Sequence, residues 1–158
     1  SELSEFTNGE FSNIIDDDEG FKSTEVNKII LCAGKLYYEL LRARREHKIF
    51  NTVIVRVEQL YPFPLEEIKY VINKYSGVSD IVWAQEEPRN QGAWFYMQSR
   101  RHLKACLRGD HQLRYAGRAY SASPAVGSLQ LHRKQQKALI EDALGLRDKI
   151  LSSPSRAI

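Results

Sequence analysis

The sequence predicts an α/β domain in three layers: an open, mostly parallel sheet with helices on both faces. Three observations lead to this prediction. β-branched stretches alternate with amphipathic ones, the first strand candidate is apolar on both faces, and no apolar run approaches the length of a membrane span. Strands that alternate with helices require right-handed crossovers, which place helices on both faces of a parallel sheet. With 158 residues and 42% hydrophobic side chains, the chain is long enough for one such domain.

The first strand is expected at residues 28–33, where the apolar run Ile29–Ala33 ends at Gly34. An apolar run without polar alternation is typical of a strand that is buried on both faces. Residues 36–47 repeat apolar side chains on one helical face, and basic side chains gather toward the C-terminal end, where cations favour the helix dipole. We therefore expect a strand, a glycine turn and an amphipathic helix in this order.

The rest of the chain continues the same alternation. Strands are expected at residues 52–57, 80–85 and 113–116, and helices at residues 64–75, 92–103 and 128–144. A proline suits the first turn of the second helix, and Gly145 is a typical stop for the last one. The tail over residues 147–158 is expected to fray, which leaves residues 26–146 as the domain.

Acidic residues concentrate near the N-terminus. Residues 1–25 contain eight acidic side chains and one cation, Lys22, although the whole chain carries a net charge of +3. We expect these residues to be an acidic linker from an upstream domain that is missing here. Within it, Asp16–Glu19 lacks the spacing of a calcium loop and is expected to be a solvated connector. The basic residues that follow are scattered rather than clustered, which argues against a nucleic-acid partner.

The cysteines and histidines suggest neither a disulfide framework nor a metal site. There are two cysteines, Cys32 and Cys106, and the four histidines are dispersed without ligand spacing. The N-terminus has neither the basic start nor the apolar stretch of a secretory signal. We therefore expect a reducing, cytoplasmic setting and no membrane partner.

In an open parallel sheet, the functional crevice lies outside the carboxyl ends of the strands. A segment of unusual composition follows each expected strand: Gly34–Lys35, residues 58–64, residues 86–94 and residues 117–124. Because parallel strands end at the same side of a sheet, we expect these segments to share one edge.

The segment from Gln85 to Trp94 combines two adjacent carboxylates, an arginine and three amides. Paired carboxylates can perform acid–base chemistry when burial raises one pKa, but a structural or interface role is favoured here. Adjacent glutamates in an extended chain point apart, so one would bond to backbone amides or to an arginine such as Arg56 or Arg118 while the other meets solvent. The candidate interface residues are Glu86, Glu87, Arg89, Asn90, Gln91 and Trp94.

A second hypothesis places an anion at the same edge. Gly34–Lys35 stands at a strand-to-helix turn, where free amide groups and the helix dipole favour a phosphate. Neither the P-loop pattern nor the dinucleotide pattern is present, so a tight turn is the simpler interpretation. Under the anion hypothesis, Lys35, Arg114 and Arg118 would converge on one ligand.

Four motifs, in this order, resemble the C-terminal domain of 2-oxoglutarate dehydrogenases, which is similar to that of transketolases. The motifs are CAGKLYYEL from Cys32, IVRVEQLYPFP from Ile54, WAQEEPRNQGAW from Trp83, and RYAGR from Arg114 with SASPAVG from Ser121. The resemblance extends from about Ser1 to Leu146, and the last motif has the form of bacterial members. Relatives often have a serine at the position of Ala33 and a proline at that of Ala119, so any contact of the serine hydroxyl is lost.

The resemblance implies one domain of the first component (E1) of the 2-oxoglutarate dehydrogenase complex. That enzyme decarboxylates 2-oxoglutarate in the tricarboxylic acid cycle and passes the succinyl group to the lipoyl arm of a second component. Thiamine diphosphate and its magnesium ion would bind outside this chain, which is expected to be inactive alone. The implied partners are the remaining domains of the enzyme, its dimer mate and the lipoyl-bearing second component.

Three alternatives stay open under this resemblance. Some relatives hold an effector, AMP or acetyl coenzyme A, on this domain, and a basic edge around Lys35, Arg42 and Arg45 would suit one. A paralogue specific for 2-oxoadipate would share the motifs, because the residues that recognise the substrate lie outside them. The aromatic set Trp94 to Tyr96 could instead dock another component of the complex, although burial in a helix explains it better.

Overall fold

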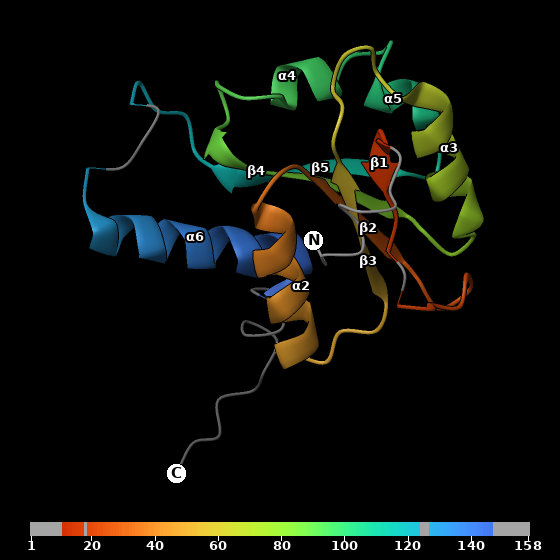
Figure 1. The fold of residues 1–158 in the computed structure, drawn as a ribbon, viewed down its shortest axis with the longest axis horizontal. Coiled ribbons are helices and arrows are strands. Elements are labelled where there is room, and N and C mark those ends of the chain that lie inside the picture. Colours follow the sequence, from red (N-terminus) through yellow and green to blue (C-terminus); the bar gives the residue numbers. More distant parts are fainter. Residues whose placement is uncertain (1–10, 18, 124–126, 147–158) are drawn as a thin grey trace.

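The computed structural model describes residues 11–17, 19–123 and 127–146, and its centre is a five-stranded sheet of order β1-β3-β2-β4-β5 (Figure 1). The strands are β1 (Ile14–Ile15), β2 (Lys28–Cys32), β3 (Thr52–Val57), β4 (Asp80–Pro88) and β5 (Gln112–Arg118). β1 pairs with β3 in the antiparallel direction, whereas the other neighbouring strands are parallel. The predicted open, mostly parallel sheet is confirmed.

β2 lies in the middle of the sheet because its side chains are apolar on both faces. Ile30 aligns with Ile54 of β3 and with Val82 of β4, and these three side chains belong to one apolar layer. The neighbouring residues Ile29 and Leu31 belong to the layer on the opposite face. Successive side chains of a strand point to opposite faces, so a strand covered on both sides needs an unbroken apolar run.

Helices cover both faces of the sheet, as predicted. They are α2 (Leu36–Glu46), α3 (Leu65–Lys74), α4 (Trp94–Met97), α5 (Leu103–Cys106) and α6 (Leu129–Leu144). In Figure 1, α2 and α6 lie below the sheet and α3, α4 and α5 lie above it. Leu40 and Leu139 fill the lower layer, whereas Ile68 and Met97 fill the upper one. The three-layer architecture follows from these two separate apolar clusters.

Two elements differ from the sequence-based expectation. β4 continues to Pro88 instead of ending at Gln85, because after an irregularity in register Pro88 pairs with Arg118 of β5. The single helix expected at residues 92–103 is two short helices, α4 and α5. Between them, the His102 ring lies 2.9 Å from the Tyr96 carbonyl oxygen, a local bond that competes with helical pairing.

The acidic run near the N-terminus is not the solvated connector that the sequence predicted. Asp17 is buried, forms an ion pair with the Arg44 guanidinium and accepts a hydrogen bond from the backbone N–H of Ile54 at 3.0 Å. Glu19 accepts from Arg44 at 2.7 Å and from Arg45 at 2.6 Å. The prediction was wrong because it ignored Arg44, which is 1% exposed and therefore needs a buried anion.

The two ends of the chain are only partly among the described residues. The expected linker lies partly outside the described residues, because residues 1–10 and 18 are not among them, and the expected frayed tail lies wholly outside them. The Ile14–Ile15 segment of the same linker forms β1, so part of it belongs to the sheet. None of the helices in the described ranges combines the length and apolarity that crossing a membrane requires.

Candidate binding edge of the sheet

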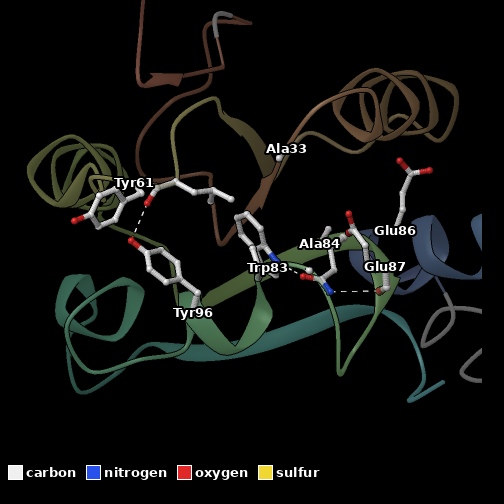
Figure 2. Close-up of a pocket in the computed structure, with 11 residues that line it drawn as sticks. Ala33, Tyr61, Trp83, Ala84, Glu86, Glu87 and Tyr96 are labelled. Atoms are coloured by element: carbon white, nitrogen blue, oxygen red, sulfur yellow. Dashed lines mark hydrogen bonds between the residues drawn. The ribbon is translucent and has the colours of Figure 1, made fainter. Parts of the chain in front are cut away.

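The carboxyl ends of β2, β3 and β4 meet at one side of the sheet and enclose a cavity of about 460 Å³ (Figure 2). We call this cavity the edge pocket, and its walls include Leu60, Tyr61, Trp83, Gln85, Glu87 and Tyr96. The walls come from the end of β4, from the loop after β3 and from α4. The site therefore lies where an open α/β sheet is expected to bind its partners.

The side chain of Gln85 fixes the floor of the edge pocket. Its Oε1 accepts a hydrogen bond from the indole Nε1 of Trp83 at 2.9 Å. Its Nε2 donates to the carbonyl oxygens of Gln91 at 2.7 Å, Pro88 at 3.2 Å and Glu87 at 3.3 Å. Because one buried amide serves both the strand and the turn after it, its polar atoms are used within the domain.

Two glycines allow the chain to close around Gln85. Gly92 has a φ of +64°, and a Cβ there would lie 2.9 Å from the Gln85 Nε2. A Cβ at Gly117 would lie 2.8 Å from the carbonyl oxygen of Gln85. Both distances are shorter than a normal van der Waals contact, so a side chain at position 92 would displace the Gln85 amide, and one at position 117 would displace the Tyr115 side chain or the backbone of β4.

Aromatic side chains form one wall of the edge pocket. The Tyr96 hydroxyl donates to the carbonyl oxygen of Leu60 at 2.8 Å and so joins α4 to the loop after β3. Tyr61, in contrast, is 85% exposed. Figure 2 shows both tyrosines on one side of the Trp83 indole and the two glutamates on the other. An exposed tyrosine beside an apolar cavity is typical of a surface that another protein covers.

The two glutamates at the end of β4 have different environments. Glu86 accepts a hydrogen bond from the Lys35 ammonium at 2.6 Å, and this contact raises the pKa of Lys35. Glu87 is exposed, and no residue in the described part of the chain forms an ion pair with its carboxylate. One glutamate is therefore paired and the other faces solvent. The cation is Lys35, whereas Arg56 pairs with Glu58 at 2.7 Å.

The other candidate interface residues tie two loops of this edge together. The Asn90 side chain donates to the carbonyl oxygen of Ser121 at 2.9 Å and accepts from the Ser121 N–H at 3.0 Å. Gln91 Nε2 donates to the same carbonyl at 3.2 Å. The Arg89 guanidinium lies 5.7 Å from the ring centre of Trp94, which is buried. These hydrogen bonds join the two loops, while Arg89 and Asn90 remain exposed at the edge.

Tyr115 connects β5 to the same edge. Its hydroxyl donates to the carbonyl oxygens of Glu87 at 3.0 Å and Arg118 at 2.9 Å. Burial raises the pKa of Tyr115 to about 12. The hydroxyl therefore stays protonated at neutral pH and keeps both hydrogen bonds.

The basic residues of the anion hypothesis do not meet at one place. Arg114 forms a two-pronged pair with Asp80 at the amino end of β4, with distances of 3.0 and 3.1 Å. Lys35 binds Glu86 at the carboxyl end of the same strand. About six residues of extended strand, roughly 20 Å, separate Asp80 from Glu86. Only Arg118 lies near the carboxyl edge with Lys35, and the carbonyl of Arg118 accepts from the N–H of Arg89 at 3.0 Å.

The basic edge that the resemblance suggested is spread along α2. Arg42 forms an ion pair with Glu46 at 3.7 Å and lines a groove of about 580 Å³ between α2 and α6. Arg45 is held by Glu19. The positive charges of Lys35, Arg42 and Arg45 are therefore neutralised at three separate positions, an arrangement that does not favour an effector with clustered phosphates.

The resemblance implies thiamine diphosphate and a magnesium ion that would bind outside this chain. Magnesium takes oxygen ligands at short, nearly octahedral distances. Among residues 11–17, 19–123 and 127–146, no three His, Cys, Asp or Glu side chains lie close enough together to hold a metal ion.

Fold and site together define an open α/β domain with a pocket at the carboxyl edge of its sheet. Residues 1–144 match the family model for the 2-oxoglutarate dehydrogenase C-terminal domain, and the chain belongs to this family. The predicted resemblance is thus confirmed.

Bacterial proteins of this family are similar to the chain over most of its length. An oxoglutarate dehydrogenase of Buchnera aphidicola is 46% identical over 148 residues, which are 94% of this chain and 16% of that protein. The 2-oxoglutarate dehydrogenase E1 component of Haemophilus influenzae is 46% identical over 144 residues, 91% of this chain and 15% of that protein. The 2-oxoglutarate dehydrogenase E1 component of Cupriavidus necator is 43% identical over 143 residues, which are 90% of this chain and 15% of that protein. The chain thus spans about a sixth of the length of these relatives.

Among the aromatic residues of the edge pocket, sequence reasoning singled out Tyr96, within the set Trp94 to Tyr96, but neither Trp83 nor Tyr61. Trp83 lies within the strand expected at residues 80–85, and Tyr96 lies within the helix expected at residues 92–103. Tyr61 offered a usable signal, since a large aromatic residue beside Pro62 in a loop after a buried strand has no helical or strand face to occupy. The placement of Tyr61 and Tyr96 on the same side of Trp83 depends on the packing of α4 against the loop after β3, where the Tyr96 hydroxyl donates to the Leu60 carbonyl oxygen.

Proposed function

We propose that this chain is the C-terminal interface domain of a 2-oxoglutarate dehydrogenase E1 component. The whole enzyme decarboxylates 2-oxoglutarate and transfers the succinyl group to a lipoyl-bearing second component, in the cytoplasm. The observation that carries the proposal is the edge pocket, which is held by the Gln85 hydrogen bonds and yet leaves Tyr61 85% exposed. Family membership and the much greater length of the relatives support it.

In this function, the carboxyl edge is covered by another domain of the enzyme or by its dimer mate. Covering a large apolar side chain such as Tyr61 contributes about 2 kcal/mol to association. The reaction itself takes place outside this domain, where thiamine diphosphate and magnesium bind. The domain contributes by completing an interface.

The first test compares two exposed aromatic residues in the full-length enzyme. Tyr61 lies at the carboxyl edge, whereas Phe50, which is 70% exposed, precedes β3 at the amino end of the strands. We expect Tyr61→Ala to weaken subunit or domain association about tenfold or more and to lower succinyl transfer. Phe50→Ala serves as the matched control and should change neither. Equal behaviour of the two variants in sedimentation and activity assays would contradict the proposal.

The second test uses the 158-residue chain alone. Purified chain supplied with thiamine diphosphate, magnesium and 2-oxoglutarate should release no carbon dioxide. Decarboxylation that depends on the chain and on both cofactors would show that the reaction does not need the missing domains, and the interface function would then be wrong.

A further inference from the structure

We propose that the edge pocket receives a cationic side chain, an arginine or a lysine, from the protein surface that covers this edge. The inference rests on the proposed function, because it names the chemistry of the covering surface. It is carried by an apolar cavity with aromatic walls and a carboxylate at its rim.

The walls of the edge pocket suit the aliphatic stem of a long side chain. Leu60, Trp83 and Tyr96 line the cavity, and the polar atoms of the two aromatic residues already have acceptors within the domain. A guest therefore meets carbon and ring surface rather than competing hydrogen-bond donors. Lysine and arginine bury their methylene groups in such surroundings while the charged head stays at the rim.

The rim carries the negative charge that the head of such a side chain needs. Glu86 is already occupied by Lys35, whereas Glu87 lines the pocket and is paired with no cation among the residues that the structure describes. The exposed ring of Tyr61 stands across the indole of Trp83 from this carboxylate (Figure 2). A guanidinium or ammonium group beside Glu87 would gain a charge-assisted hydrogen bond, and the aromatic rings that line the pocket would lie along the stem of the same side chain.

The domain already holds one of its own arginines in this way at the same end of the sheet. The Arg56 guanidinium lies 5.2 Å from the ring centre of Tyr37 and 5.4 Å from that of Tyr38, and it pairs with Glu58 at 2.7 Å. The edge pocket offers the same combination of tyrosine and glutamate without the arginine. Charge complementarity thus selects a cationic guest over a neutral or an acidic one.

Titration of the 158-residue chain with a blocked amino acid tests this inference. The probe is Nα-acetyl-arginine methylamide, and the control is the citrulline analogue, which has almost the same shape but no charge. We expect saturable shifts of the Trp83 indole N–H and of the Tyr61 ring in NMR spectra. Affinity for the arginine probe should exceed that for citrulline about fivefold, the size of one exposed charge-assisted bond.

Two glutamate variants test which carboxylate provides the negative charge that binds the probe. Glu87→Gln keeps the shape of the rim and should abolish the difference between arginine and citrulline. Glu66→Gln removes another exposed carboxylate, on α3 outside the edge pocket, and should leave the difference unchanged. The inference is overturned if arginine causes no shift at about 50 mM, or if its preference over citrulline is absent or survives Glu87→Gln.

The outcome is separable from that of the proposed function. If Tyr61→Ala weakens association of the full-length enzyme while Glu87→Gln leaves it unchanged, the interface is real and its guest is not cationic. If neither variant affects association, the interface function itself fails. Salt provides one more distinction, because a cationic guest requires association to weaken as ionic strength rises.

Discussion

Two acidic segments of this chain are alike in composition but lie in opposite environments. Asp16 to Glu19 precedes the domain core, and Glu86 and Glu87 end β4. In the first segment, Asp17 is buried against Arg44 and the backbone of β3. In the second, one carboxylate pairs with an exposed lysine and the other meets solvent.

The difference shows that a carboxylate is buried when the fold brings a buried cation to it. Arg44 lies on the inner side of α2, where it also donates to the carbonyl oxygen of Thr52 at 3.0 Å, and only an anion can offset its desolvation. The carboxyl edge contains no comparable buried cation beside Glu87 among the described residues, so this charge remains available to a partner. The first segment serves stability, whereas the second is the segment that we propose for binding.

The largest expected effect comes from breaking the buried pair. Asp17→Asn leaves Arg44 without its main counter-charge, and the free energy of unfolding should fall by about 3–5 kcal/mol. Urea unfolding at neutral pH measures this loss. Glu87→Gln is the matched control at the other acidic segment and should change stability by less than about 0.5 kcal/mol. Similar losses in both variants would remove the distinction between the two segments.

A smaller loss of stability is expected when a side chain is added in the turn that forms part of the edge pocket. Gly92→Ala introduces a Cβ at a φ of +64° and 2.9 Å from the Gln85 amide, so stability should fall by about 1–3 kcal/mol. Gly109→Ala is the control, because nothing lies within 4 Å of its Cβ position. The same urea titration compares the two. A neutral Gly92→Ala would mean that the Gln85 hydrogen bonds do not hold this turn.

Alkaline pH should weaken the hydrogen bonds that Tyr115 makes at the carboxyl edge. Burial raises the pKa of Tyr115 from its ordinary 10.0 to about 12, so the unfolded chain loses this proton first. The free energy of unfolding therefore declines as pH rises from about 10 to about 12, and its contribution is complete below pH 10. Tyr115→Phe should show a shallower decline between about pH 10 and about pH 12 in urea unfolding. An identical decline in both proteins would show that the Tyr115 hydroxyl is not protected in the native edge.

The smallest effect is expected at the exposed ion pair. Lys35→Met removes the partner of Glu86, and because the Lys35 side chain is 64% exposed, stability should change by no more than about 1 kcal/mol. The same variant frees a second carboxylate at the rim of the edge pocket, so it should strengthen binding of the arginine probe. Unchanged binding in Lys35→Met would show that the Glu86 carboxylate does not reach the guest.

Much of the fold could be derived from patterns local in the chain. The unbroken apolar run that ends at Gly34, the β-branched strand over Thr52–Val57 and the left-handed Gly145 after α6 each depend on neighbouring residues. The spacing of their apolar residues predicts the observed elements, because a strand or helix must bury its apolar face in any compact arrangement. The rule that strands of a parallel sheet end together also located the candidate edge.

The partners of polar side chains required the folded chain. Asp17 and Arg44, or Glu86 and Lys35, are distant in sequence, and no local pattern states which charge will meet which. The length of β4 and the division between α4 and α5 depended in the same way on contacts with β5 and on a bond from the His102 ring. The periodicity of apolar residues is a property of each segment by itself. The pairing of charges and the shape of a pocket depend on how several segments are placed relative to one another, and only the packing of the sheet and its helices determines that placement.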